Sequence, residues 1–138
     1  MSMFCYQCEQ TSKGTGCTAG GVCGKSPEVA ALQDVLVHVT KGIAQYAHRA
    51  RQLGATDCEV NTFTIHALFS TVTNVNFDTE RLNGLIDQGL ELRDKAKGLY
   101  EGACSSAGKQ PDVLAGPAVW EAACFHRHSW LAVGQAAS

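Results

Sequence analysis

Four of the seven cysteines in this chain lie close together near its start, and their spacing limits what that segment can fold into. Cys5 and Cys8 form a C-x2-C pair, eight residues separate Cys8 from Cys17, and five more separate Cys17 from Cys23. The C-x2-C spacing lets two sulfurs converge on one centre, and soft thiolates select zinc or an iron–sulfur cluster rather than hard ions. Residues 1–25 show no helical or strand periodicity, so we expect an ordered loop whose structure depends on something other than an apolar core.

The glycines and lysines of this loop help to choose between the two kinds of metal site. A cuboidal cluster needs backbone close to its faces and N–H groups directed at its sulfurs, and glycine permits that approach. Lys13 and Lys25 would offset the negative charge of such a cluster. Structural zinc more often uses two C-x2-C knuckles, which the C-x5-C spacing of the second pair fits poorly. The residues favour an iron–sulfur cluster, with zinc as the second alternative and free or disulfide-bonded thiols as the third. The loop glycines are Gly14, Gly16, Gly20, Gly21 and Gly24.

Composition narrows the classes of protein that remain. The chain has 138 residues, 45% of them hydrophobic, which suits one globular domain with a sizeable core. Eleven basic against 13 acidic residues give a net charge of -2, so we expect no binding to nucleic acid or to an anionic membrane surface. No apolar run approaches the ~18 residues that span a bilayer, and no export signal opens the sequence. We therefore expect a cytoplasmic protein, in which clustered cysteines bind metal more often than they form disulfides.

The sequence after the cysteine loop predicts a long first helix. Ser26, Pro27 and Glu28 supply an N-cap, a proline at the first helical position and an acid in the first turn. Gly54 offers a C-terminal stop, and Gly42, a costly residue in mid-helix, is interpreted as a close helix contact. The apolar stripe predicted to face the core is Val29, Leu32, Leu36, Val39, Ile43, Tyr46, Ala50 and Leu53.

Two further helices complete an antiparallel three-helix bundle over residues 26–102. The second is expected to start near Asn61, to end around residues 74–76, and to use Phe63, Ile65, Leu68, Phe69 and Val72 as its apolar positions. The third follows Asp78, a good N-cap, and runs to Gly102. Its apolar positions are Leu82, Leu85, Ile86, Leu92, Ala96 and Leu99. The fold class is thus all-α, with the cysteine loop 1–25 at one end of the bundle.

Residues 103–138 are interpreted as a linker and C-terminal tail, with one short helix in 119–138. Within that tail, His126 and His128 with Cys124 could supply a second metal site, although a polar tail is favoured. We expect no metal role for the scattered Cys58, Cys104 and Cys124. His38 and His66 are expected at the edge of the core or on the surface.

Several sequence segments together resemble a known family. They are Met3-Phe4-Cys5-Tyr6-Gln7-Cys8-Glu9-Gln10-Thr11, Gly16-Cys17-Thr18, Gly21-Val22-Cys23-Gly24-Lys25, Pro27-Glu28, Leu32-Gln33-Asp34, Lys41-Gly42, Leu68-Phe69-Ser70-Thr71-Val72-Thr73-Asn74 and Asn76-Phe77. These segments resemble the N-terminus of the hybrid cluster proteins, also called prismane proteins or hydroxylamine reductases. The resemblance covers about residues 3–120, and residues after about Trp120 no longer resemble the continuation of the family.

The resemblance implies a cofactor and its ligands. The resemblance implies that the proximal cubane of the family is held by Cys5, Cys8, Cys17 and Cys23. The wide spacing of these cysteines matches family members with a [4Fe-4S] rather than a [2Fe-2S] centre. Family members are several times longer. Their hybrid iron–sulfur–oxygen cluster is bound by His, Glu and Cys ligands, one of them persulfidated, from domains that would lie beyond this chain.

Three functional hypotheses follow. The first is an electron-transfer module with one [4Fe-4S] cluster, no catalytic residues and no hydroxylamine reduction by the isolated chain. The second is a fragment of a full hydroxylamine or nitric oxide reductase, and the third is a zinc-stabilised interaction domain. The first hypothesis requires a redox partner protein, and a homodimer with cluster loops near its interface is an open alternative to a monomer.

Overall fold

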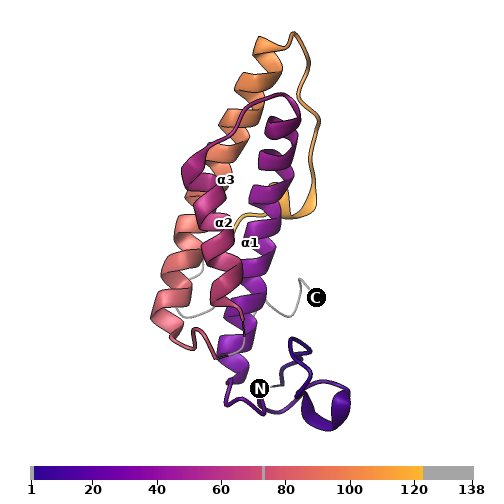
Figure 1. Cartoon of the computed structure of the whole chain (residues 1–138), viewed down its shortest axis with the longest axis vertical. Coiled ribbons are helices and arrows are strands. Elements are labelled where there is room, and N and C mark those ends of the chain that lie inside the picture. Colours follow the sequence, from indigo (N-terminus) through magenta and orange to yellow (C-terminus); the bar gives the residue numbers. More distant parts are fainter. Residues whose placement is uncertain (1, 73, 123–138) are drawn as a thin grey trace.

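Three α-helices form an antiparallel bundle in the computed structural model, which describes residues 2–72 and 74–122 (Figure 1). They are α1 (Pro27–Gln52), α2 (Cys58–Ser70) and α3 (Thr79–Ser106). Among the described residues there is no strand beyond a single isolated bridge in the cysteine loop, and no helix is long and apolar enough to cross a membrane. The predicted fold class, an all-α three-helix bundle with an N-terminal cysteine loop, is confirmed.

Side chains before each helix cap its first turn. The hydroxyl of Ser26 accepts a hydrogen bond from the Val29 N–H at 3.2 Å, as the sequence predicts for the start of α1. The carboxylate of Asp57 accepts from the Val60 N–H at 2.9 Å, so α2 begins three residues before the expected start near Asn61. Asp78 caps α3, as predicted.

The core lies mainly between α1 and α3, which make the most extensive contact in the bundle. All the predicted stripe positions of α1 are buried except Leu53, which is half-buried at the end of the helix. On α3 the predicted positions are also buried, except for a half-buried Leu99. The amphipathic period of these two helices therefore predicts their packing correctly. The most completely buried large side chains are Leu36, Ile43, Leu82 and Ile86.

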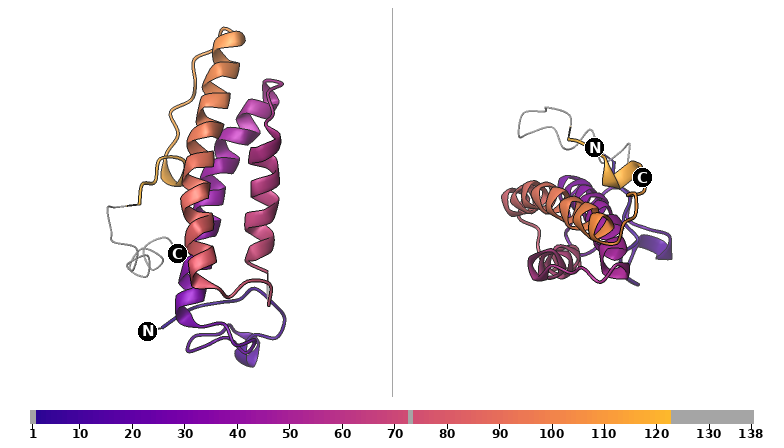
Figure 2. Two further views of the ribbon diagram at one scale, coloured as in Figure 1. Left: turned by 90° about the vertical axis from the view of Figure 1, so that its left-hand side faces the viewer. Right: turned by 90° about the horizontal axis from the view of Figure 1, so that it is seen from above.

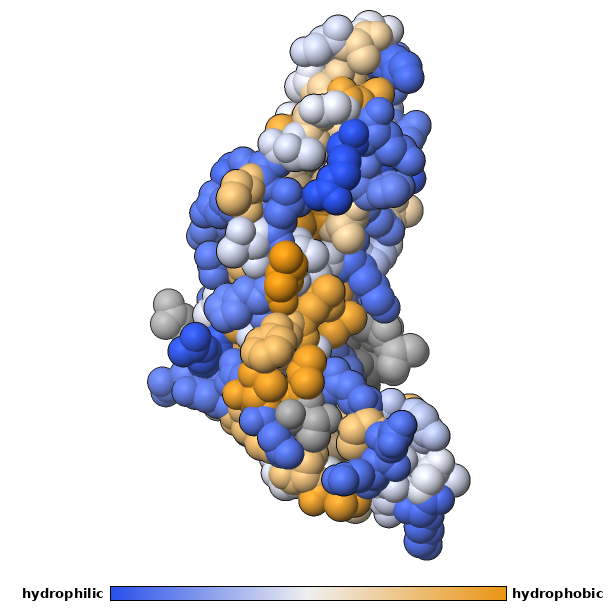
Figure 3. Space-filling view, in the orientation of Figure 1, coloured by the Kyte–Doolittle hydropathy of each residue, from blue (hydrophilic) through white to orange (hydrophobic). Residues whose placement is uncertain are grey.

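The buried face of α2 differs from the predicted one. Of the five predicted positions only Phe63 is buried; the others, Ile65, Leu68, Phe69 and Val72, are exposed. The buried positions are Val60, Phe63, Ala67 and Ser70, which follow steps of three and four. Apolar residues surround α2, so hydropathy alone could not select its inner face, and Figure 3 shows the resulting apolar surface over this helix.

After α3 the chain turns back and runs along the bundle as a strap, residues 107–122 (Figure 2). α3 continues to Ser106, four residues past the expected end at Gly102. The strap contains a short 3-10 helix, η2 (Gly116–Ala118), which packs on α1 with Ala118 buried.

Gly42 of α1 lies directly under the strap. A Cβ atom at Gly42 would overlap the carbonyl group of Pro117. The close contact predicted for Gly42 is therefore real, but its main partner is the strap rather than another helix. Arg93 of α3 adds a hydrogen bond to the carbonyl oxygen of Trp120. The predicted helix in 119–138 and the segment with Cys124, His126 and His128 lie largely or wholly outside the described residues.

Candidate metal centre

The cysteine loop lies at the end of the bundle where α1 begins (Figure 1). Cys5 and Cys17 face each other across an antiparallel bridge, with N···O distances of 3.0 Å and 2.9 Å in the two directions. Met3 adds a third backbone hydrogen bond, to Thr18, at 3.0 Å. Residues directly opposite each other in such a bridge project their side chains to the same side. The fold of the loop therefore places the thiols of Cys5 and Cys17 on one face.

The environment of the Cys17 thiol favours its deprotonated form, the thiolate. The residue is buried, and the backbone N–H of Ser12 lies 3.4 Å from its sulfur. The pKa of Cys17 is lowered first by that N–H and then by the N–H of Val22; burial opposes this effect and the charge of Lys25 adds to it. Hydrogen bonds from N–H groups to sulfur are the contacts expected around thiolate ligands.

Fewer contacts define the positions of the other two predicted ligands, Cys8 and Cys23. Cys8 and Cys23 are half-buried in the same loop, and a Cβ at Gly21 would come within 3.1 Å of the Cys23 sulfur. Val22, the neighbour of Cys23, contributes an N–H to Cys17, so the Cys23 segment passes next to that thiol. No three His, Cys, Asp or Glu side chains converge on a metal-binding geometry within residues 2–72 and 74–122. The structure thus brings Cys5 and Cys17 together, and the four-thiol set stays a prediction.

A lysine adjoins the paired thiols. The Nζ atom of Lys25 lies 3.6 Å from the Cys5 sulfur and donates a hydrogen bond to the Gln7 side-chain oxygen at 3.0 Å. The Gln7 amide nitrogen in turn donates to the Thr71 hydroxyl at 3.2 Å, which links the loop to the end of α2. The sequence predicted Lys25 as a positive charge near the metal centre. It did not predict the contact between Gln7 and Thr71, because no local pattern indicates a contact across 64 residues.

The donors in this loop fit a thiolate-bound, negatively charged group. Four cysteines lie in one loop, and all six described cysteines are free thiols. A cation lies next to the half-buried Cys5, and backbone N–H groups lie next to the buried Cys17. Such a group would be held by soft sulfur ligands, with its charge offset by Lys25.

The remaining cysteines and histidines lie elsewhere. Cys104 is buried in the core and Cys58 is exposed at the first turn of α2. His66 is exposed, as expected of a surface residue. His38 is half-buried and packs edge-to-face against Trp120 with ring centroids 5.5 Å apart; burial and, to a smaller extent, Lys41 lower its pKa. His38 and His66 thus lie where they were expected, at the edge of the core and on the surface, and the absence of a metal role for Cys58 and Cys104 stays a prediction.

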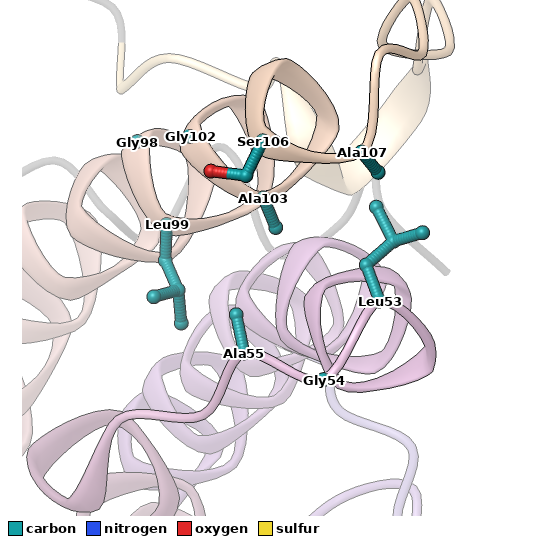
Figure 4. Close-up of a pocket in the computed structure, with 9 residues that line it drawn as sticks. All are labelled: Leu53, Gly54, Ala55, Gly98, Leu99, Gly102, Ala103, Ser106 and Ala107. Atoms are coloured by element: carbon teal, nitrogen blue, oxygen red, sulfur yellow. The ribbon is translucent and has the colours of Figure 1, made fainter.

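A shallow pocket opens at the opposite end of the bundle, between the C-terminal turn of α1 and the last turns of α3 (Figure 4). None of its lining side chains is titratable or able to ligate a metal strongly, so it offers no site for acid–base or metal chemistry. It is lined by Leu53, Gly54, Ala55, Gly98, Leu99, Gly102, Ala103, Ser106 and Ala107.

The fold and the loop define a helical bundle with a cysteine-rich end, and comparison with known proteins gives the family. The model of the Prismane/CO dehydrogenase family matches residues 3–120, and the chain belongs to this family. The predicted resemblance to the prismane proteins is confirmed.

Curated relatives are hydroxylamine reductases. That of Rhodospirillum rubrum is 47% identical over 136 residues, 99% of this chain and 25% of the relative. That of Geobacter sulfurreducens is 52% identical over 122 residues, 87% of this chain and 22% of the relative. The chain spans about a quarter of the length of these relatives and matches their N-terminal part.

The extent of the similarity differs in one respect from the prediction. The family model ends at residue 120, as expected, but the alignment with the Rhodospirillum rubrum relative covers 99% of the chain. The expectation that similarity stops at about Trp120 is therefore wrong for that relative. The segment after Trp120 has no periodic apolar pattern, so hydropathy gives no sign of this extended similarity.

Proposed function

We propose that this chain is an electron-transfer module that binds one [4Fe-4S] cluster through Cys5, Cys8, Cys17 and Cys23. The observation that carries the proposal is the pairing of Cys5 and Cys17 on one face, with a lysine ammonium 3.6 Å from the Cys5 sulfur. The spacing of the four cysteines supports a cluster over structural zinc, and membership of the prismane family supports it further. When bound, such a cluster accepts and releases one electron at a time.

The residues of the loop would bind the cluster and control its surroundings. The bridge fixes Cys5 against Cys17, and the N–H of Ser12 points at the Cys17 sulfur. Electron relay needs no general acid or base from the protein. Phe4 and Tyr6 of the loop are exposed, so a redox partner protein could approach the loop directly.

The name of the relatives suggests hydroxylamine reduction for the full-length proteins. This chain matches about a quarter of each of those proteins, and we propose that these 138 residues alone do not catalyse that reaction. We also propose a cytoplasmic location and a redox partner protein, and a homodimer as the alternative to a monomer.

Metal and sulfide analysis of anaerobically purified protein tests the proposal. We expect a brown protein with about four iron and four acid-labile sulfides per chain and a paramagnetic signal on reduction. One zinc without labile sulfide would contradict the cluster and favour an interaction domain. Hydroxylamine consumption with a chemical reductant would contradict the assignment of a relay without catalysis.

A further inference from the structure

Lys25 is a buried cation without a carboxylate partner in the described part of the chain. Its side chain and backbone together are only 3% exposed. The ammonium contacts one neutral oxygen, that of Gln7 at 3.0 Å, and one sulfur, that of Cys5 at 3.6 Å. Asp34 of α1 is near enough to interact electrostatically with Lys25, but the two groups form no ion pair.

The other buried cation in residues 2–72 and 74–122 shows the usual arrangement. Arg93 is 8% exposed, and its guanidinium pairs with the Asp94 carboxylate at 3.0 Å. Burial of a charge is unfavourable unless an opposite charge compensates it. Of the two described groups that contact the Lys25 ammonium, only the Cys5 sulfur can supply that charge, as a thiolate or as part of an anionic metal–sulfur group.

The surrounding loop fixes the position of this ammonium. The Gly21 N–H donates to the Lys25 carbonyl oxygen at 2.8 Å, and a Cβ at Gly21 would lie 2.9 Å from the Lys25 Cβ. Lys25 also directly precedes Ser26, the N-cap of α1. Gln7, which binds the ammonium, is itself bonded to Thr71 at the end of α2. The bundle therefore anchors the charge from both α1 and α2.

We propose that Lys25 is a positioning residue whose fixed positive charge raises the reduction potential of the metal–sulfur centre in the cysteine loop; this inference rests on the proposed function. Reduction adds one electron from an external donor, which is oxidised by one electron. No bond is made or broken, and no proton moves. The reduced centre has one more negative charge than the oxidised centre, so a nearby buried ammonium stabilises the reduced form more.

The test is a redox titration of the cluster-loaded full chain, with dithionite as reductant and the visible absorption of the cluster as the signal. In Lys25→Met, which keeps the length of the side chain but removes the charge, we expect the ratio of reduced to oxidised protein at a fixed potential to fall about tenfold. That change corresponds to a midpoint about 59 mV more negative for a one-electron couple. Lys25→Arg keeps the charge, and we expect less than half of that shift.

Lys13→Met is the matched control, because Lys13 lies in the same loop but is exposed. Water screens an exposed charge, so we expect the potential of this variant to equal that of the unchanged protein. An equal shift in Lys13→Met and Lys25→Met would overturn the inference, as would a Lys25→Met protein with an unchanged potential.

The outcomes separate this inference from the proposed function. An unchanged protein without iron and labile sulfide would overturn both, whereas loaded proteins with equal potentials would overturn the role of Lys25 alone. If Lys25→Met does not retain the cluster, the iron content of Lys25→Arg decides. If Lys25→Arg retains its iron, a positive charge is required at this position. If Lys25→Arg also loses its iron, the shape of the side chain matters and not its charge.

Discussion

The cysteine loop and the helical bundle use different interactions to keep their structure. The bundle buries an apolar cluster that includes Leu36, Ile43 and Ile86, so each of its long helices is stabilised along its length. In the loop, the buried residues are mainly Thr11, Cys17 and Lys25, and the backbone is joined by a few hydrogen bonds. A region with so little apolar burial needs another source of order, which the proposed metal centre would supply. The difference predicts that the two regions respond separately to mutation.

The largest effect is expected from Cys17→Ser. Loss of a ligand should remove the cluster completely, so iron and labile sulfide fall to the background, and residues 4–25 should lose their protection from hydrogen exchange. The bundle should retain its far-UV helicity, because its stability comes from apolar packing. Cys104→Ser is the control: Cys104 lies in the core, so this variant should keep its iron. Collapse of helicity together with the loss of iron in Cys17→Ser would show that loop and bundle are one unit.

Leu36→Ala is the complementary experiment, because it weakens the core of the bundle and leaves the cysteine loop unchanged. Leu36 is fully buried, so its truncation should lower the free energy of unfolding by about 2–5 kcal/mol, measured by urea denaturation and far-UV circular dichroism. Leu68→Ala makes the same chemical change on the exposed face of α2 and should alter stability by less than about 0.5 kcal/mol. Iron content in the folded protein should be unchanged in both variants. Loss of iron from folded Leu36→Ala protein would contradict the separation of the two regions.

Gly42→Ala tests whether the strap belongs to the bundle. The added methyl group would overlap the Pro117 carbonyl, so we expect a loss of about 1–3 kcal/mol and faster hydrogen exchange in residues 107–122. Gly98→Ala is the control, because a Cβ at this α3 position meets nothing within 4 Å and alanine is the better helix former. This control should be neutral or more stable. Unchanged exchange in the strap of Gly42→Ala would show that the strap does not depend on this contact.

The sequence predicted the fold well where a single periodic signal decides the structure. The stripe of α1 and the caps at Ser26 and Asp78 are local features, and the structure confirms them. On α2, by contrast, apolar residues occur all around the helix, and only packing against its neighbours selects Val60 and Ala67 as the inner face. Tertiary packing decides which of several apolar helix faces is buried, and the periodicity of hydropathy along the sequence cannot predict that choice.

The sequence indicated where the candidate site lies but not what surrounds it. Clustered cysteines are visible in any sequence, so Cys5 and Cys17 could be named before their bridge was seen. The contact between Gln7 and Thr71 spans 64 residues and depends on how α2 ends against the loop. Such a contact leaves no local signal in composition or spacing. Gly42 did leave a local signal, a glycine in mid-helix, but that signal could not identify its partner, Pro117, which lies 75 residues away in sequence on the strap.

The smallest expected effect is a change in thermal stability on loss of Asp57, the N-cap of α2. Asp57 lies in the bundle, far from the cysteine loop in sequence. The pKa of Asp57 is lowered, first by the Val60 N–H and then by Lys95, whose Nζ lies 2.9 Å from the carboxylate. Asp57→Ala removes both contacts, so we expect the midpoint of thermal unfolding to fall by a few degrees at pH 7. Lys95→Met keeps the cap and removes the ion pairs of Lys95 with Asp57 and Glu59, and it should cause a smaller decrease.

The pH dependence of this decrease has a definite sign. Because folding lowers the pKa of Asp57, its stabilising effect is complete above the ordinary aspartate pKa of 3.8 and is lost as the pH falls through the lower folded value. The difference in midpoint between the unchanged protein and Asp57→Ala should therefore be constant from about pH 7 down to about pH 5 and shrink below pH 3.8. A difference that grows on acidification would mean that the neutral carboxyl is the better cap. Iron content should not change in either variant, because this cap belongs to the bundle and makes no contact with the cysteine loop among its hydrogen bonds and ion pairs in the described residues.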